Sequence, residues 1–227
     1  MRRYTTLFFD LDDTLLDFQK AESTAVREVF ALHGLPNDDA SAARYSEINR
    51  GYWQRFERGE IRREDIFVSR FRDFLQEKNL VGNAEQIAQD YFDRLAMQHD
   101  LVSGAEEVLT ALGQAGYRRY LTTNGLLRTQ QKRVRESGLS GLTDGLFISE
   151  ELHCQKPDPC YFDAVIARIE EKDRRKILVI GDSLSSDIRG GILSGLDTCW
   201  FNPKHKESDI SATYEIQRLA DLKKLLL

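Results

Sequence analysis

The segment Leu7–Leu15 reads LFFDLDDTL, and the rest of the chain is interpreted from it. Three apolar residues run directly into three carboxylates and a threonine, which is the pattern of a buried strand that ends in an acidic turn. Carboxylates this close together repel one another, so a cation or a bound proton is expected at the end of the strand. The alternative is an aspartate-rich turn whose side chains cap backbone amides. We take an active site as the working hypothesis.

The composition is that of a soluble globular protein. The chain has 227 residues, of which 41% are apolar and 30% charged, which fits one large domain or a core with a smaller inserted one. The net charge is −5, and the basic clusters at 118–119 and 174–176 are short, so no nucleic-acid partner is expected. No signal peptide or membrane-spanning stretch is recognised, so we expect no membrane partner and a cytoplasmic protein.

The cysteines bear on the redox compartment. Cys154, Cys160 and Cys199 are an odd number without a C-x-x-C pair. This favours a reducing compartment over a disulfide framework, and it makes a zinc site improbable.

Residues 17–99 show helical periodicity and no convincing strand. Four amphipathic segments of this kind are expected to close into a small bundle. The sequence therefore predicts a core made of residues 1–16 and 100–227, with an inserted helical cap at 17–99. The predicted apolar stripes are Ala25, Val26, Val29 and Phe30; Tyr45, Ile48, Tyr52 and Phe56; Ile66, Phe67, Phe71, Phe74 and Leu75; and Ile87, Tyr91 and Leu95.

After residue 103 strands and helices alternate. Ser103 and Glu106 have the spacing of a capping box at the start of a helix. Continuous apolar strands separated by helices predict an α/β fold with a doubly wound parallel sheet, in which ligands bind at the carboxyl ends of the strands near a topological switch point. The predicted strands are 117–122, 145–149, 177–180 and 198–201, and the predicted helices include 129–137, 159–169, 188–193 and 219–226.

Polar residues follow several of these strands. Taken singly, each has a plainer explanation: Asn124 with Gly125 as a turn, Lys156 as a solvated lysine, Asp187 as a helix-start carboxylate. Glycines 190, 191 and 195 fit close packing or turns better than a phosphate cradle. Carboxylates, a hydroxyl, an amide and one cation at successive strand ends together indicate a magnesium and phosphate site. The set is Asp10, Asp12 and Thr14; Thr123 and Asn124; Lys156; and Asp182, Ser183 and Asp187.

At this point the chain resembles the haloacid dehalogenase superfamily of phosphotransferases. The four motifs of that superfamily match residues 10–14 (DLDDT), 123–124 (TN), 156–157 (KP) and 181–183 (GDS) followed by Asp187. The insertion resembles the helical cap of its first type, and the resemblance covers essentially the whole chain. Details at 17–18, 52–57, 123–125 and 181–184 are most similar to the pyrimidine-preferring 5'-nucleotidases, so the resemblance implies a phosphomonoesterase for nucleoside monophosphates.

The resemblance also implies roles for the motif residues. Asp10 would attack phosphorus and form an aspartyl-phosphate, so it must be ionised. Lys156 and one Mg²⁺ ion, held by Asp10, Asp182 and the backbone carbonyl of Asp12, would keep it so. Asp12 would protonate the leaving alcohol and then activate water.

Further residues would support this chemistry. Thr123 and the backbone amides near Leu11 and Asn124 would hold the transferring oxygens. Asp187 would orient metal-bound water or Lys156, and Ser183 is expected beside it.

In the predicted cap, residues 51–58 carry more aromatic and cationic character than one buried face absorbs. We expect Trp53, Arg55 and Phe56 to contact the substrate. The alternative is a solvated helix face with Trp53 half-buried. A monomer or a dimer is expected.

Two other functions remain as alternatives. A phosphatase for phosphoglycolate or a sugar phosphate would use the same core with a different cap. A receiver-like signalling domain also has an acidic pocket with a lysine, but its acceptor lies on the third strand and it has no inserted cap. Asp12 favours hydrolysis, because the resemblance implies that dehalogenases lack this aspartate and that P-type ATPases carry threonine there. Thr14 is expected to stabilise the turn, and Asp13 to cap a backbone amide.

Overall fold

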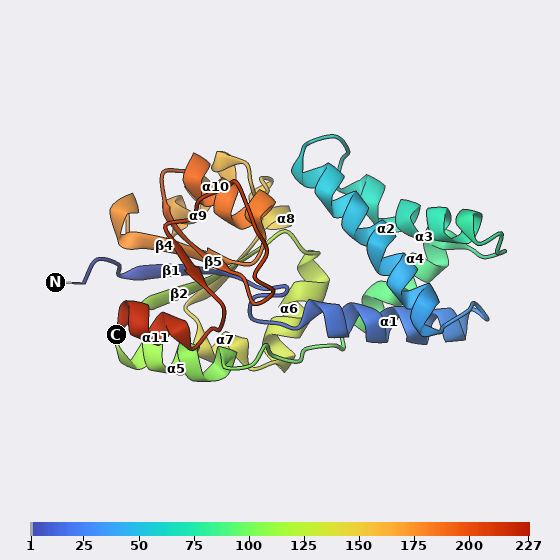
Figure 1. The fold of residues 1–227 in the computed structure, drawn as a ribbon, viewed down its shortest axis with the longest axis horizontal. Helices are drawn as coiled ribbons and strands as arrows, with labels where there is room; N and C mark the ends of the chain where they lie inside the picture. Colours follow the sequence, from blue (N-terminus) through green and yellow to red (C-terminus); the bar gives the residue numbers. More distant parts are fainter. Residues whose placement is uncertain (1) are drawn as a thin grey trace. The chain divides into compact units, whose positions relative to one another are not determined.

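A computed structural model describes residues 2–227 (Figure 1). The chain divides into two compact units. One contains the residues up to Asp17 together with Asp100–Leu227, and the other is Phe18–His99. Each unit has its own hydrophobic core.

The larger unit is built on a six-stranded sheet in which every neighbouring pair is parallel. The strand order is β3-β2-β1-β4-β5-β6, so the chain leaves β1 first toward one edge and later toward the other. The order therefore reverses between β1 and β4, where open α/β sheets bind their ligands. The predicted α/β fold class is confirmed. The strands are β1 (Thr6–Asp10), β2 (Arg118–Thr123), β3 (Gly145–Ile148), β4 (Ile177–Gly181), β5 (Asp197–Phe201) and β6 (Tyr214–Ile216).

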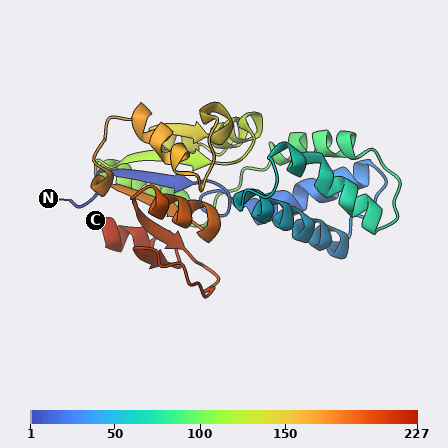
Figure 2. The same cartoon turned by 90° about the horizontal axis from the view of Figure 1, so that it is seen from above.

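Strand β1 is buried on both faces. Leu7 and Phe9 pack in the same hydrophobic cluster as α5 and α11, whereas Phe8 stacks on Phe162 of α9 at a centroid separation of 6.0 Å. Helices thus cover both faces of the sheet, as Figures 1 and 2 show. The helices of this unit are α5 (Ala105–Gln114), α6 (Leu127–Glu136), α7 (Leu139–Leu142), α8 (Ser149–Leu152), α9 (Pro159–Arg168), α10 (Arg189–Leu193) and α11 (Asp221–Leu226), with short turns η1 (Arg174–Lys176) and η2 (Leu184–Ile188).

Two glycines of α10 confirm the close-packing interpretation. A Cβ on Gly190 would lie 3.0 Å from the Cα of Pro157, and one on Gly191 would meet the side chain of Thr198. The predicted capping box at Ser103 is wrong, because α5 begins after Gly104 in a left-handed conformation and no side chain caps it. Strand β6 and the short helices α7 and α8 were not predicted, since three or four residues carry too little periodicity.

The smaller unit consists of four helices around a core of its own, and the four predicted helices are confirmed. Their apolar stripes meet in one cluster that includes Phe30, Tyr45, Phe74 and Tyr91. Among the described residues, none of the helices is both long and apolar enough to cross a bilayer. The helices are α1 (Phe18–Leu32), α2 (Asp39–Glu57), α3 (Glu64–Glu77) and α4 (Ala84–Leu95).

Candidate active site

Three carboxylates converge at the carboxyl ends of β1 and β4. Asp10 is the last residue of β1, Asp182 follows β4, and Asp187 lies in η2. One oxygen of each lies within 4.8 Å of the others. Asp187 is fully buried and Asp10 nearly so, which makes their mutual repulsion strong. These three carboxylates, all predicted from the strand ends, do meet in space.

Lys156 supplies a positive charge to this cluster. Its ammonium donates to Oδ1 of Asp10 at 2.6 Å, to Oδ1 of Asp187 at 2.7 Å and to the carbonyl of Thr122 at 3.0 Å. The side chain is 1% exposed, so all three donors of the ammonium are used inside the protein. This lysine is not the solvated one that its sequence context alone would suggest.

The side-chain amide of Asn124 holds the backbone of Lys156. Its Nδ2 donates to the Lys156 carbonyl at 2.8 Å, and its Oδ1 accepts from the Lys156 amide at 3.0 Å. The side chain of Asn124 therefore positions Lys156. Only the backbone amide of Asn124 is left for the predicted contact with the phosphate oxygens.

The electrostatics of the cluster favour either a bound proton or a further cation. Burial raises the pKa of Asp10 to about 8, with the Asp187 charge adding to the effect and Lys156 opposing it. Burial, followed by the charge of Asp10, also raises the pKa of Asp182 well above its ordinary value. The carboxylates raise the pKa of Lys156 despite its burial. One lysine does not neutralise three carboxylates, and three converging carboxylate oxygens are the donor set that Mg²⁺ prefers.

Neighbouring backbone groups fix Asp182 and Asp187. The hydroxyl of Thr14 accepts from the Asp182 amide at 3.1 Å, so this threonine ties the β1 loop to the β4 loop. The Asp187 carboxylate occupies the space next to Gly181 that a Cβ would fill, and it accepts from the Ser183 amide at 3.2 Å. Ser183 caps η2 by accepting from Ser186. Of the two predicted neighbours of the metal ligands, Ser183 thus lies beside the cluster and Asp187 belongs to it.

Asp12 lies outside this cluster of side chains. Its carboxylate accepts hydrogen bonds from Arg133 and, at 2.6 Å, from Nε2 of Gln130. Of the carboxylates predicted at the site, Asp187 therefore shares the side-chain cluster with Asp10 and Asp182, and Asp12 does not. The expected metal contact of Asp12 is through its backbone carbonyl, and this contact stays a prediction.

Gln130 and Arg133 were missed from the sequence. Both lie on α6, which begins four residues after Thr123, and both are about 1% exposed. Their i, i+3 spacing on the buried face of a helix was the available signal. Sequence periodicity assigns polar positions to the solvent face, so it passed over them.

Other residues of the predicted site fall near this region. The Thr123 hydroxyl is buried and accepts from the Gly125 amide at 2.9 Å. Leu11 is fully buried, and its carbonyl accepts from the amides of residues 14–16 in the turn after β1. Asp13 takes a left-handed conformation in the same turn, with its amide donating to Leu16.

The predicted substrate-contact residues of the cap all lie on the last part of α2. Phe56 is buried and packs edge-on against Trp53 at 5.7 Å between ring centroids. Trp53 is half-buried, and Arg55 is exposed with its guanidinium over the ring of Tyr52. Their contact with substrate stays a prediction.

The cysteine interpretation requires a correction. Cys154 and Cys160 form a disulfide that closes the loop carrying Lys156, and Cys199 is free and buried. The odd count concealed a pair separated by six positions, which no C-x-x-C search detects.

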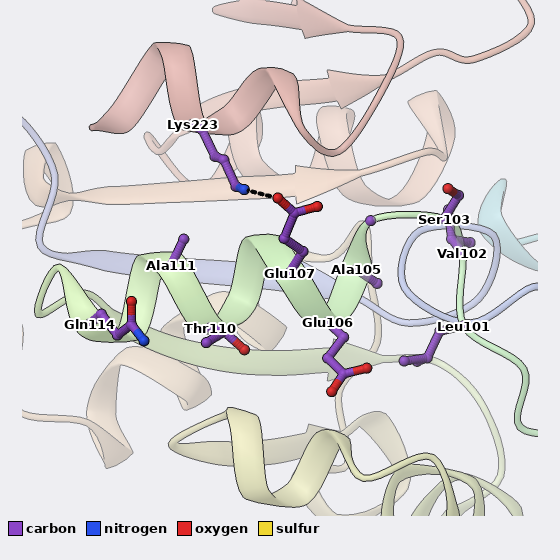
Figure 3. A pocket seen from close by; sticks show the side chains of 11 residues that line it. Leu101, Val102, Ser103, Ala105, Glu106, Glu107, Thr110, Ala111, Gln114 and Lys223 are labelled. Atoms are coloured by element: carbon purple, nitrogen blue, oxygen red, sulfur yellow. Dashed lines mark hydrogen bonds and ion pairs between the residues drawn. The ribbon is translucent and has the colours of Figure 1, made fainter.

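A hollow of about 720 Å³ lies elsewhere, along α5 (Figure 3). Its wall includes Glu106, Thr110 and Gln114, and Lys223 pairs with Glu107 at its edge. None of the eleven residues that line it belongs to the carboxylate cluster. The hollow and the carboxylate cluster are therefore separate features of this unit.

Several known proteins are similar to this chain. A family model for haloacid dehalogenase-like hydrolases matches residues 4–195. YfnB of Bacillus subtilis, a HAD-hydrolase, is 41% identical over all of this chain and 97% of its own. The pyrimidine 5'-nucleotidase PynA of Streptococcus pneumoniae is 36% identical, covering 96% of this chain and 93% of its own. A glyceraldehyde 3-phosphate phosphatase of Pyrococcus furiosus is 30% identical over all of this chain and 94% of its own.

The fold agrees with these similarities. The crystal structure of YfnB, which is bound to magnesium, superposes with a TM-score of 0.94 and covers 99% of both chains. The family model and the phosphatases among the relatives show that the protein is a phosphoric monoester hydrolase. It belongs to the haloacid dehalogenase-like hydrolases, as the motifs at the strand ends predicted.

Proposed function

We propose that this phosphatase depends on magnesium, works through an aspartyl-phosphate and takes pyrimidine nucleoside 5'-monophosphates as substrates. The observation that carries the mechanism is the contact between Lys156 and Asp10 inside the carboxylate cluster. The similarity to PynA over nearly the whole chain supports the substrate class.

Asp10 is the nucleophile. Its Oδ1 is bound by Lys156, and its other carboxylate oxygen attacks phosphorus in line with the leaving alcohol. The Lys156 ammonium offsets the negative charge of the nucleophile, which otherwise repels the phosphate dianion. The product is a mixed anhydride, which is reactive enough for water to hydrolyse it.

Asp12 moves the protons. It donates a proton to the leaving ribose oxygen as the bond to phosphorus breaks, and it takes one from water when the aspartyl-phosphate is hydrolysed. The hydroxyl of Thr123 donates to a phosphoryl oxygen as negative charge develops there.

One Mg²⁺ ion would be held by the carboxylates of Asp10 and Asp182 and by the backbone carbonyl of Asp12. Asp187, which shares the cluster, would offer a further oxygen. When bound, the ion would neutralise the negative charge of the carboxylates and of the transferring phosphate. The magnesium in the crystals of YfnB supports this assignment.

The helical unit Phe18–His99 provides substrate selectivity in this proposal. Trp53 and Arg55 combine an aromatic face with a cation on one turn of α2. In this proposal a pyrimidine ring stacks on Trp53, and Arg55 attracts the anionic nucleotide.

The experiment compares wild type with Asp10→Asn in a phosphate-release assay with Mg²⁺ and with a chelator. Wild type is expected to release phosphate only with Mg²⁺, and the variant to lose at least about 10³-fold in kcat because the amide is not a nucleophile. Wild-type turnover by the variant would overturn the mechanism. Exposed Asp209→Asn serves as the matched control.

The substrate class has its own test. Comparing kcat/KM for UMP, dUMP, dTMP, phosphoglycolate and glyceraldehyde 3-phosphate separates the nucleotidase from the second candidate, a phosphatase of small metabolites. The similarity to the Pyrococcus enzyme supports that second candidate. A preference for glyceraldehyde 3-phosphate would reject the nucleotide assignment and leave the mechanism intact.

A further inference from the structure

We propose that Gln130 and Arg133 of α6 are positioning residues that hold the Asp12 carboxylate in place for its two proton transfers. The inference rests on the proposed function, because it assumes that Asp12 serves as acid and base. It adds a structural cause for the placement of that group, drawn from a helix outside the four motifs.

The contacts form a closed network. Nε2 of Gln130 donates to Oδ2 of Asp12 at 2.6 Å and to the hydroxyl of Thr123 at 3.0 Å. Nη1 of Arg133 donates to Oδ1 of Asp12 and, at 3.0 Å, to Oε1 of Gln130. Each oxygen of the carboxylate thus has its own donor, so rotation of the carboxyl group breaks at least one hydrogen bond.

The network also fixes the orientation of the Gln130 amide. Because Oε1 accepts from Arg133, Nε2 must face Asp12 and Thr123. One amide nitrogen therefore sets the separation between the proposed proton carrier and the proposed phosphate-binding hydroxyl.

The burial of Gln130 and Arg133 indicates that their hydrogen bonds to Asp12 do more than cover the sheet. Gln130 and Arg133 are each 1% exposed, and burying a guanidinium carries a desolvation cost that an apolar side chain would avoid. A helix that only covered the sheet would place apolar residues there, as α6 does at Val134.

The charges are divided between two cations. Lys156 lies between Asp10 and Asp187, and Arg133 pairs with Asp12. Asp12 therefore does not compete for Lys156. The ion pair with Arg133 keeps the Asp12 side chain apart from the cluster of Asp10, Asp182 and Asp187.

Gly125 leaves the room that the network needs. A Cβ at this position would overlap the Gln130 side chain, so Gly125→Ala must displace the amide without changing any charge. The glycine after Thr123 and Asn124 thus has a steric role in addition to forming a turn.

The test separates the two proton transfers by choice of leaving group. p-Nitrophenolate leaves without a proton, whereas the ribose oxygen of UMP needs one. In Arg133→Met, phosphoenzyme formation from p-nitrophenyl phosphate should stay within about threefold of wild type, while its hydrolysis slows by roughly 10- to 100-fold. A burst of p-nitrophenolate approaching one per enzyme is expected, together with a drop in kcat for UMP at nearly unchanged KM.

Related variants grade the effect. Gln130→Met and Gly125→Ala should show the same burst with a smaller loss, and Arg133→Lys should recover part of the rate by restoring the charge without the planar fork. Gln131→Met and Arg135→Met are matched controls on the exposed face of α6 and should behave as wild type. Thermal midpoints report whether each variant is folded.

The outcomes are distinguishable. Loss of both steps by the same factor, without a burst, would show that the pair only supports the fold, and unchanged rates would also overturn the proposal. If Arg133→Met fails to fold, the bursts of Gln130→Met and Gly125→Ala decide between these outcomes. An active Asp10→Asn variant would reject the proposed function itself, whereas an inactive one with no burst in the α6 variants rejects only this inference.

Discussion

The ammonium of Lys156 lies 2.6 Å from Oδ1 of Asp10, although 146 positions separate the two residues in the sequence. The contact forms because the carboxyl ends of β1 and β4 and the loop before α9 meet at one point. Asp187 also accepts from this ammonium, at 2.7 Å. Small displacements of Asp187 should therefore affect the nucleophile through the lysine.

Gly181→Ala tests this coupling without altering a charged residue. The new Cβ would overlap the Asp187 carboxylate, which must shift away from Lys156. We expect kcat to fall by about 10- to 100-fold with the protein still folded, since a displacement near 1 Å has this effect on a positioned group. Steady-state kinetics with Mg²⁺ measure it. Gly141→Ala is the control, because a Cβ there meets nothing within 4 Å; equal kinetics in both variants would contradict the coupling.

Magnesium should stabilise the protein more as the pH rises. In the metal-free protein the pKa of Asp10 is raised from 3.8 to about 8, so the folded state keeps a proton that the unfolded state releases. That contribution to stability is complete below pH 3.8 and is lost as the pH rises toward 8. A bound cation removes the cost of ionising the cluster.

Thermal unfolding at pH 6 and pH 8, with Mg²⁺ and with a chelator, checks this expectation. The metal-free midpoint should fall between the two pH values, and the increase on adding Mg²⁺ should be larger at pH 8. Asp182→Asn should reduce the increase, because it removes one proposed ligand. A magnesium effect that does not change with pH would contradict the assignment of the raised pKa to the metal site.

The sequence predicted the parallel sheet and most of the site for a simple physical reason. Strands such as β4 are continuous apolar runs, and parallel strands bring the polar residues after Asp10 and Gly181 to one edge. Lys156 belonged to the set because two prolines hold its segment extended. Local chemistry and topology were sufficient for these residues.

The remaining part of the site depends on side-chain pairing across the fold, which periodicity does not encode. Arg133 is buried because Asp12 lies opposite it, and Cys154 is oxidised because the turn into α9 returns Cys160 to it. The sequence predicted Asp187 next to the metal ligands and not among them. Its carboxylate lies in the cluster with Asp10 and Asp182 because η2 winds back over Gly181. Each of these pairings forms only when the loops fold against one another.

The disulfide should stabilise the Lys156 loop without being needed for catalysis. Cys154→Ser is expected to lower the free energy of unfolding by about 2 kcal/mol, the loop-closure value for a ring this small. Its kcat should stay close to that of wild type, because Asn124 holds the Lys156 backbone independently. Urea unfolding with and without a reductant measures the effect. Reductant should bring wild type to the stability of the variant, and identical curves for reduced and oxidised wild type would contradict the prediction.

A buried polar chain inside the helical unit should control the stability of that unit. Asn49 on α2 donates to Glu22 of α1 and accepts from Arg70 of α3, and all three side chains are at most 5% exposed. Asn49→Ala removes both bonds and leaves two charged groups without this partner. We expect a loss of about 2 to 4 kcal/mol in the free energy of unfolding.

The matched control for that substitution is Ser46→Ala on the same helix. Ser46 also donates to Glu22, but it is only half-buried, and its loss should cost at most about 1 kcal/mol. Urea unfolding followed by the fluorescence of Trp53, in a Trp200→Phe background, reports on the helical unit because Trp53 lies on α2. Equal stabilities for the two variants would mean that Asn49 is not the residue that links α1 to α3. A larger loss for Asn49→Ala would instead identify the amide as the contact that links Glu22 to Arg70, since both charged side chains are buried.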